Sequence, residues 1–281
     1  MTVSTLRDVL APCLDDGTAV AGLVVLGWED ALAYVRAAEA ARRPVILQAG
    51  PGCRAHTPLP VLGAMFRTLA ERASVPVVAH LDHGESLEVC REAADCGFTA
   101  VMFDGSALAL EENIDRTAEI VRWAHPHGIS VEAELGFVGY QDGKPSLGTD
   151  PGEVARFARE TAVDALAIAV GNRHLMTTPG ASVDRALLDA IQSAAPALPL
   201  VLHGGSGIDA ALRRRLAAET RICKMNIGTE LRIAFGAALR EVLAADPALF
   251  DRIRILGATV PAVAAAAQAA IESLCGPLPP G

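Results

Sequence analysis

The stretch PVVAHLDHGESLEVCREAADCGFTAVMFDGS, residues 76–106, contains a complete strand–helix–strand unit. The short apolar runs PVVAHL and TAVMF are typical of buried strands, and SLEVCREAADCG between them has the apolar spacing of a helix. The first strand ends in Asp82 and His83, and the second ends in Asp104. The unit therefore predicts two parallel strands joined by a crossover helix, with an imidazole and carboxylates at the strand ends.

Similar units repeat along the 281-residue chain. The apolar runs are AVAGLVVL (from 19), PVILQA (44), PVVAHL (76), TAVMF (99), SVEAEL (130), DALAIAV (164), LPLVLH (198) and RICKMNI (221). Eight strand–helix units in about 250 residues fit a (β/α)₈ barrel. We predict an α/β fold, with one TIM barrel domain over residues 1–281 that includes a C-terminal helical extension at 248–281. A doubly wound open sheet is the alternative, although no GxGxxG follows the first strand.

Composition narrows the classes of function. The net charge of −9 argues against nucleic acid and anionic membranes as partners. Six cysteines without a CxxC pair, and acids where an export signal needs an apolar core, predict a cytoplasmic protein with reduced thiols. The Ala-rich segment ATVPAVAAAAQAAIESL is too short for a membrane span on this interpretation, and we expect a terminal helix there.

Polar side chains end six consecutive predicted strands, the third to the eighth. They are Asp82 with His83, Asp104, Glu134, His174, His203, and Asn226 with Thr229. In a parallel barrel these strand ends share the face that carries the active site. Three imidazoles from separate strands suit a catalytic zinc, which keeps a fourth position open for substrate.

Each of these residues also has a purely structural interpretation. A strand-end histidine is often only hydrogen-bonded, and an Asp before Gly is usually a turn residue. His80 could support the site or simply be a satisfied core residue. Lys224, in the eighth strand, is the alternative nucleophile if the enzyme forms a Schiff base instead of using a metal.

Two glycine-containing segments follow the last two strands, GGSG from Gly204 and NIGT from Asn226. Glycine allows backbone N–H groups to approach an oxyanion closely, and a following helix adds its N-terminal field. Barrel enzymes commonly bind phosphate at these two loops. The pair therefore predicts a phosphorylated small-molecule substrate, although each segment alone could be an ordinary turn.

The motifs HLDHG, MFDGS…EENI, VEAELG, AVGNRH, LHGGSGI and KMNIGTELR resemble, in order, those of the class II, zinc-dependent ketose-bisphosphate aldolases, which include the fructose- and tagatose-bisphosphate enzymes. The resemblance implies a cytoplasmic lyase of carbohydrate metabolism that is a homodimer or homotetramer. It makes or cleaves a carbon–carbon bond of a ketose phosphate, with dihydroxyacetone phosphate forming the enediolate. The alternative is a non-catalytic or isomerase-like relative that binds metal and sugar phosphate.

The resemblance also implies roles for particular residues. His83, His174 and His203 would hold the zinc, and Asp104 and Glu134 would form a second position for a divalent or monovalent cation. Asp82 would be the acid/base at the C4 hydroxyl. The phosphate cradle would consist of Gly204, Gly205, Ser206, Asn226, Gly228 and Thr229.

The chain departs from the family pattern where substrate is expected. Val24 replaces an Asn, Gly50 replaces a hydroxyl residue, and Leu175 replaces a Gly. These changes predict that the aldehyde partner or the phosphate pattern of the substrate differs from that of glycolysis. In the loop GYQDG, Asp142 replaces the family's proton-exchanging Glu if the alignment has no gap; with a one-residue gap, Gln141 falls there and cannot act as a base.

Overall fold

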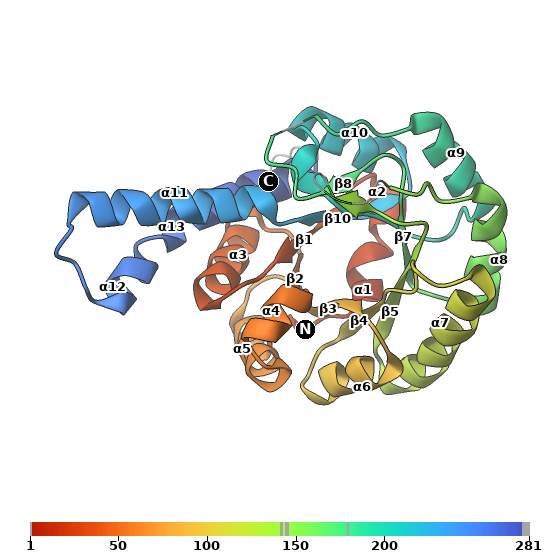
Figure 1. Cartoon of the computed structure of the whole chain (residues 1–281), viewed down its shortest axis with the longest axis horizontal. Coiled ribbons are helices and arrows are strands. Elements are labelled where there is room, and N and C mark those ends of the chain that lie inside the picture. Colours follow the sequence, from red (N-terminus) through yellow and green to blue (C-terminus); the bar gives the residue numbers. More distant parts are fainter. Residues whose placement is uncertain (1, 141–142, 144–145, 179, 277–281) are drawn as a thin grey trace.

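The computed structural model describes residues 2–140, 143, 146–178 and 180–276. Its eight long strands are parallel and close into a barrel in the order β1-β10-β9-β7-β5-β4-β3-β2 (Figure 1). The strands are β1 (Val20–Val24), β2 (Val45–Ala49), β3 (Val77–Gly84), β4 (Ala100–Phe103), β5 (Ser130–Leu135), β7 (Ala165–Ile168), β9 (Leu200–Leu202) and β10 (Ile222–Ile227). The predicted TIM barrel is confirmed, and each predicted apolar run overlaps one of its strands, although β3 continues beyond its run to Gly84.

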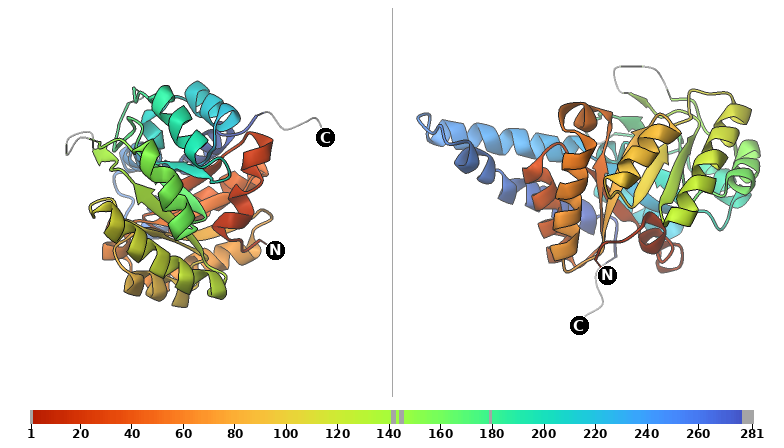
Figure 2. Two further views of the ribbon diagram at one scale, coloured as in Figure 1. Left: turned by 90° about the vertical axis from the view of Figure 1, so that its right-hand side faces the viewer. Right: turned by 90° about the horizontal axis from the view of Figure 1, so that it is seen from below.

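Helices follow the strands and surround the barrel (Figures 1 and 2). Several begin at the side-chain caps that the sequence offers; for example, Asp150 accepts a hydrogen bond at the start of α8, where Pro151 is the first helical residue. The helices up to the last strand are α1 (Leu6–Leu10), α2 (Cys13–Asp16), α3 (Trp28–Ala41), α4 (Pro51–His56), α5 (Leu59–Arg72), α6 (Leu87–Asp95), α7 (Leu110–Ala124), η1 (His125–His127), α8 (Pro151–Thr161), α9 (Arg185–Ala194), η2 (Gly205–Gly207) and α10 (Ala210–Glu219).

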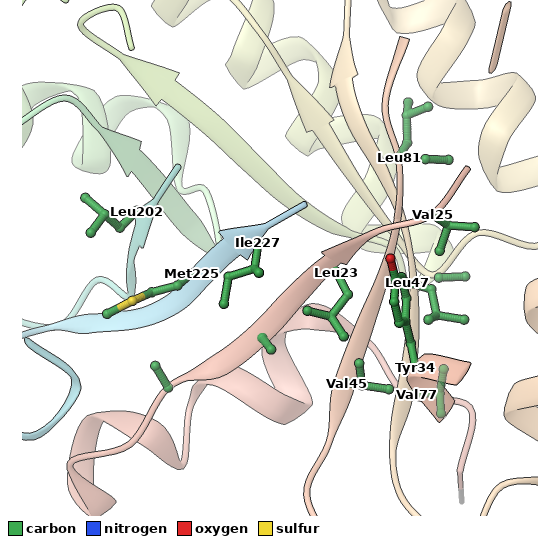
Figure 3. Packing of buried hydrophobic residues seen from close by; sticks show 14 of the residues in the cluster. Leu23, Val25, Tyr34, Val45, Leu47, Val77, Leu81, Leu202, Met225 and Ile227 are labelled. Carbon is green, nitrogen blue, oxygen red and sulfur yellow. The ribbon is translucent and has the colours of Figure 1, made fainter. Parts of the chain in front are cut away.

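Alternate residues of each strand face outwards and form the larger hydrophobic core. Leu23, Leu47 and Leu81 belong to this layer, which the helices cover (Figure 3). The Tyr34 hydroxyl of α3 donates a hydrogen bond to the Val24 carbonyl at 3.1 Å and ties its helix to the end of β1. Because this apolar layer lies outside the barrel, the inward positions are available for polar groups.

The barrel interior changes from apolar to polar along its axis. At the N-terminal end of the strands, α1 and α2 close the barrel with Leu6 and Leu10, which pack against inward residues such as Ile46 and Val78. A fully buried polar layer follows, and it contains Gln48, His80, Glu132 and Lys224. The predicted site residues lie beyond this layer, at the C-terminal ends of the strands.

The C-terminal helices form an arm that projects from the barrel (Figures 1 and 2). The arm consists of α11 (Thr229–Ala245), α12 (Arg252–Gly257) and α13 (Val260–Glu272), and α13 packs along α3. Residues 252–272 are long and apolar enough to cross a membrane, with 21 residues and a mean hydropathy of 1.4, so the expectation of a segment too short for a span is wrong on length. A single run of this kind is weak evidence for a span, and α13 buries Val263 and Ala267 in the hydrophobic core.

Candidate metal and phosphate site

Asp82 and His83 both line the same cavity although they are neighbours on β3. Consecutive residues of a regular strand point to opposite faces. Here the pairing register of β3 with β4 shifts between Leu81 and Gly84, and His83 adopts a left-handed backbone with φ of +51°. This bulge turns the second side chain to the inside, so that an acid and an imidazole serve one site.

The three histidines predicted as zinc ligands come together at the top of the barrel. The ring centroids of His83 and His203 are 4.9 Å apart. The ring centroid of His174 lies 5.7 Å from that of His83 and 5.5 Å from that of His203. One nitrogen from each ring lies within 4.8 Å of the others. His174 lies on β8 (Arg173–His174), a short strand that pairs in parallel with β6 (Gly139–Tyr140).

Asp104 and Glu134 form a second cluster that shares His83 with the first. The three residues offer ligand atoms within 4.8 Å of one another. Nδ1 of His83 lies 2.7 Å from Oδ2 of Asp104 and 3.9 Å from Oε2 of Glu134. The other oxygen of Asp104 accepts hydrogen bonds from the Ser106 hydroxyl at 2.6 Å and the Ser106 amide at 3.1 Å.

The donor set fits a divalent ion. Nδ1 of His203 and Oε2 of Glu134 are buried and have no hydrogen-bond partner within the described chain. Such atoms are costly to bury unless a ligand satisfies them. The other ring nitrogen of His203 lies 3.3 Å from Oε1 of Glu132, the arrangement that orients a metal-binding imidazole. Three imidazoles, one held in this way, suit zinc with an open fourth position.

The charges of the metal-free site are strongly perturbed. Burial opposes a charge on His83, but Asp82 and the hydrogen bond with Asp104 raise its pKa to about 9. Burial lowers the pKa of His174 to about 4 and that of His203 well below its usual value. Burial also raises the pKa of Glu134 to about 8. Burial would raise the pKa of Asp82 as well, but nearby cationic groups, chiefly His83, lower it overall. Asp82 is therefore ionised at neutral pH.

The site opens into a cavity of about 350 Å³. One side is formed by the segments predicted to bind phosphate, and Gly205 is buried in the short turn η2 directly behind that wall. The Ser206 hydroxyl accepts hydrogen bonds from the amides of Gly228 and Glu230, at 3.2 and 3.4 Å, which fixes η2 against the start of α11. The lining residues from these segments are Gly204, Ser206, Asn226, Gly228 and Thr229.

The three departures from the family pattern also line this cavity: Val24, Gly50 and Leu175. Leu175 has φ of +60°, a left-handed conformation in which glycine is unstrained and leucine is not. The backbone therefore retains the shape of a glycine position although its side chain is large. Asp142 and Gln141 lie outside the described residues.

Lys224 is not placed to be a Schiff-base nucleophile. Its side chain is fully buried below the cavity, and Nζ lies 2.6 Å from Oε2 of Glu132. The same carboxylate lies 3.5 Å from His80, which is also fully buried. His80 and Lys224 thus belong to the polar layer beneath the site.

Sequence reasoning missed several residues at or near the site, among them three charged ones. Glu132 precedes Glu134 by two positions on a strand, and this spacing alone places both on the inner face. Arg232 lines the cavity one helical turn after Thr229. Arg54 donates hydrogen bonds to backbone carbonyls at the ends of β2 and β3, a contact that residue types do not reveal.

Known proteins resemble this chain in sequence and in fold. Residues 4–276 match the family described as "Fructose-bisphosphate aldolase class-II". The chain is 37% identical over 264 residues to a fructose-bisphosphate aldolase of Geobacillus stearothermophilus, covering 92% of this chain and 91% of that one. It is 40% identical over 252 residues to a 6-phospho-5-dehydro-2-deoxy-D-gluconate aldolase of Shouchella clausii, covering 86% and 84% of the two chains. The crystal structure of the YdjI aldolase from Escherichia coli K12 superposes with a TM-score of 0.86 at 33% identity, covering 97% of both chains.

Proposed function

The chain belongs to the class II fructose-bisphosphate aldolase family, and we propose that it makes or cleaves the C3–C4 bond of a ketose phosphate, with dihydroxyacetone phosphate as the enediolate-forming partner. The family implies a divalent metal. The observation that carries the proposal is the convergence of His83, His174 and His203 beside the buried carboxylate of Asp82. A protein that only bound metal would not need this acid in its cavity.

We assign zinc to the three histidines, and a second cation to Asp104 and Glu134 beside His83. Zinc, when bound, supplies a Lewis acid that polarises the substrate carbonyl and stabilises the enediolate charge. The histidines must be uncharged to serve as ligands, and burial favours that state for His174 and His203.

Asp82 accepts the proton of the C4 hydroxyl in the cleavage direction and returns it in synthesis. Its lowered pKa keeps the carboxylate ionised, as a base requires. The amide of Asn226 donates a hydrogen bond to Oδ1 of Asp82 at 3.4 Å and orients it. Oδ2, which faces Gly50 in the cavity wall, is the oxygen that we propose receives the proton.

The substrate phosphate binds between η2 and the first turn of α11. Gly228, the N-cap residue of this 17-residue helix, has no side chain to cap it, and Ser206 accepts hydrogen bonds from the Gly228 and Glu230 amides. The positive end of the helix lies at the cavity wall formed by Gly228 and Thr229. An anion is stabilised there by the helix field and by backbone amides. This local site holds a phosphate in spite of the net charge of −9.

We propose an aldehyde partner other than the glycolytic one. Val24 and Gly50 offer no side-chain hydrogen bond to substrate, and Leu175 narrows the cavity. Among the described lining residues, Arg232 alone is an arginine or lysine, so an aldehyde with an anionic end fits best. The relatives' names span two different sugar phosphates, and they leave the choice of substrate open.

A synthesis assay tests the substrate assignment. Dihydroxyacetone phosphate is combined with glyceraldehyde 3-phosphate, malonate semialdehyde or an uncharged aldehyde such as lactaldehyde. We expect malonate semialdehyde, the anionic aldehyde of this panel other than glyceraldehyde 3-phosphate, to give the highest kcat/KM. Activity on fructose 1,6-bisphosphate as high as on any other substrate would refute the specialisation.

Two variants test the assignment of roles. His174→Ala is expected to lose bound zinc, whereas Asp82→Asn is expected to keep zinc and lose about 10²–10⁴-fold in kcat. Asp82→Asn turnover within tenfold of the parent would refute the role of this acid. Zinc and substrate bound tightly by the parent without cleavage, or ketone proton exchange without aldehyde release, would favour the non-catalytic or isomerase-like alternatives instead.

We also propose that the protein is a cytoplasmic homodimer or homotetramer. The projecting arm carries apolar side chains that are nearly fully exposed, Phe250 at 93% and Ile253 at 84%. Neighbouring exposed apolar groups favour a contact surface, and we assign this one to a second copy of the chain. Light scattering after size-exclusion chromatography gives the number of subunits, and a monomer at micromolar concentration would contradict this proposal.

A further inference from the structure

Two arginines contact backbone carbonyls at the edge of the site, and they support different halves of it. Arg54 comes from α4, after β2, and Arg213 comes from α10, after β9. Neither residue lines the cavity. We propose that Arg54 positions the metal-binding half through the end of β3, whereas Arg213 independently positions the phosphate-binding half through η2.

Arg54 joins the ends of two neighbouring strands. One guanidinium nitrogen donates hydrogen bonds to the carbonyls of Ala49 at 2.9 Å and Asp82 at 2.6 Å. The other donates to the carbonyl of His83 at 3.0 Å. The two consecutive carbonyls of β3 thus belong to the acid/base residue and to the histidine shared by both metal clusters.

This contact is made where the backbone is least regular. The ladder between β3 and β4 is interrupted between Leu81 and Gly84, so the strand register does not hold Asp82 and His83 in place. His83 is also in the left-handed region, which a non-glycine residue adopts only when its surroundings impose it. Arg54 supplies hydrogen bonds there that the sheet lacks.

Arg213 makes a corresponding contact on the other half. It is 4% exposed, and its Nε donates a hydrogen bond to the carbonyl of Gly205 at 3.1 Å. Its two terminal nitrogens each lie 2.9 Å from a carboxylate oxygen of Glu230, in the first turn of α11. Arg213 therefore joins η2 to the helix start that forms the other wall of the phosphate cradle.

The two contacts share no residue, and their effects can be separated. A group that orients a metal ligand from outside typically changes metal affinity or activity by about 10–100-fold when removed. Removing Arg54 is therefore expected to weaken zinc binding and to lower kcat. Removing Arg213 is expected to raise the KM for the phosphorylated substrate.

The test uses Arg54→Met and Arg213→Met, which keep a long side chain and remove the donors. Zinc dissociation constants are measured by competition with a chromophoric chelator, and kcat and KM are measured at saturating zinc. We expect Arg54→Met to bind zinc about 10–100-fold more weakly and Arg213→Met to remain within twofold of the parent. Arg213→Met is expected to raise the KM severalfold, with kcat little changed.

The zinc measurement needs no turnover, so the proposal about Arg54 can be judged even if the aldol reaction proposed above proves wrong. Thermal unfolding of the metal-free variants identifies a general loss of folding. If Arg54→Met does not fold, Arg54→Lys, which retains the charge and fewer donors, is expected to lie between the parent and complete loss. A parent-like zinc dissociation constant in the folded Arg54 variant, or equal loss of zinc affinity in both arginine variants, would overturn the proposal.

Discussion

The buried pair of Glu132 and Lys224 allows a quantitative prediction for stability. Both side chains are fully buried, and Nζ of Lys224 lies 2.6 Å from Oε2 of Glu132. The other oxygen of Glu132 lies 3.3 Å from His203. Removing one partner of such a pair leaves a buried polar group without its counter-charge, which costs about 3–5 kcal/mol. For a domain stable by about 5–15 kcal/mol, that loss is a large part of the total.

We therefore expect Lys224→Met and Glu132→Gln each to lower the free energy of unfolding of the metal-free protein by about 3–5 kcal/mol. The double variant removes both charges together, and we expect it to lie within about 2 kcal/mol of the parent. Urea unfolding followed by circular dichroism, with a chelator present, measures these differences without a contribution from zinc. The exposed pair of Arg116 and Glu112 provides a matched control, and Arg116→Met is expected to cost no more than about 0.5 kcal/mol.

Two results would refute this reasoning. Single variants within about 1 kcal/mol of the parent would show that the pair contributes little or that water reaches it. Single losses that simply add in the double variant would show that the two charges do not depend on each other. Repeating the titration with zinc separates this stability effect from the effect of Glu132 on the orientation of His203.

Three further predictions concern the rim of the site. Although burial lowers the pKa of His83, the neighbouring carboxylates raise it to about 9, so zinc binding at pH 7 should release about one proton, and zinc affinity should rise about tenfold per pH unit up to pH 9. Calorimetry in buffers of different ionisation enthalpy measures the proton release, and a pH-independent zinc affinity would contradict this prediction. Leu175→Gly should lower the KM for dihydroxyacetone phosphate in initial-rate assays, and an unchanged KM would argue against a role of Leu175 in the pocket. The free energy of unfolding should change by less than about 1 kcal/mol, because relief of the left-handed backbone strain offsets the greater entropy of the unfolded chain with glycine. In Gly204→Ala the new Cβ would lie 2.1 Å from the Arg173 carbonyl oxygen at a φ of +70°, so this variant should have a lower melting temperature than the parent. The control Gly257→Ala, whose new Cβ has nothing within 4 Å, should melt within a few degrees of the parent, and equal melting temperatures of the two variants would be inconsistent with the collision.

The sequence predicted the barrel and the imidazole cluster because both follow from local patterns. Apolar runs of strand length mark the eight strands, and in a parallel barrel all their C-terminal ends meet at one face. His83, His174 and His203 could therefore be brought together without knowing any distance. The same rule placed Glu134 at the site.

The rest depended on contacts that local patterns do not show. Arg54 binds carbonyls 28 and 29 residues away, and a carbonyl is present at every position, so no residue type signals this partner. The role of Lys224 depends on its partner Glu132, which is 92 residues away in the chain and lies across the barrel. The bulge that turns His83 inwards depends on pairing with β4, which is a tertiary interaction.

The closure of the barrel by α1 and α2 has a consequence for modification of the protein. Leu6 and Leu10 pack among apolar side chains at the floor, with the Glu132 layer between them and the reacting groups. The apolar closure that stabilises the barrel and the groups that react thus lie at opposite ends of the barrel. Space-filling substitutions at the closed end are expected to raise thermal stability without changing the active site, so that the lining of the cavity is free to be varied separately for unnatural aldehydes.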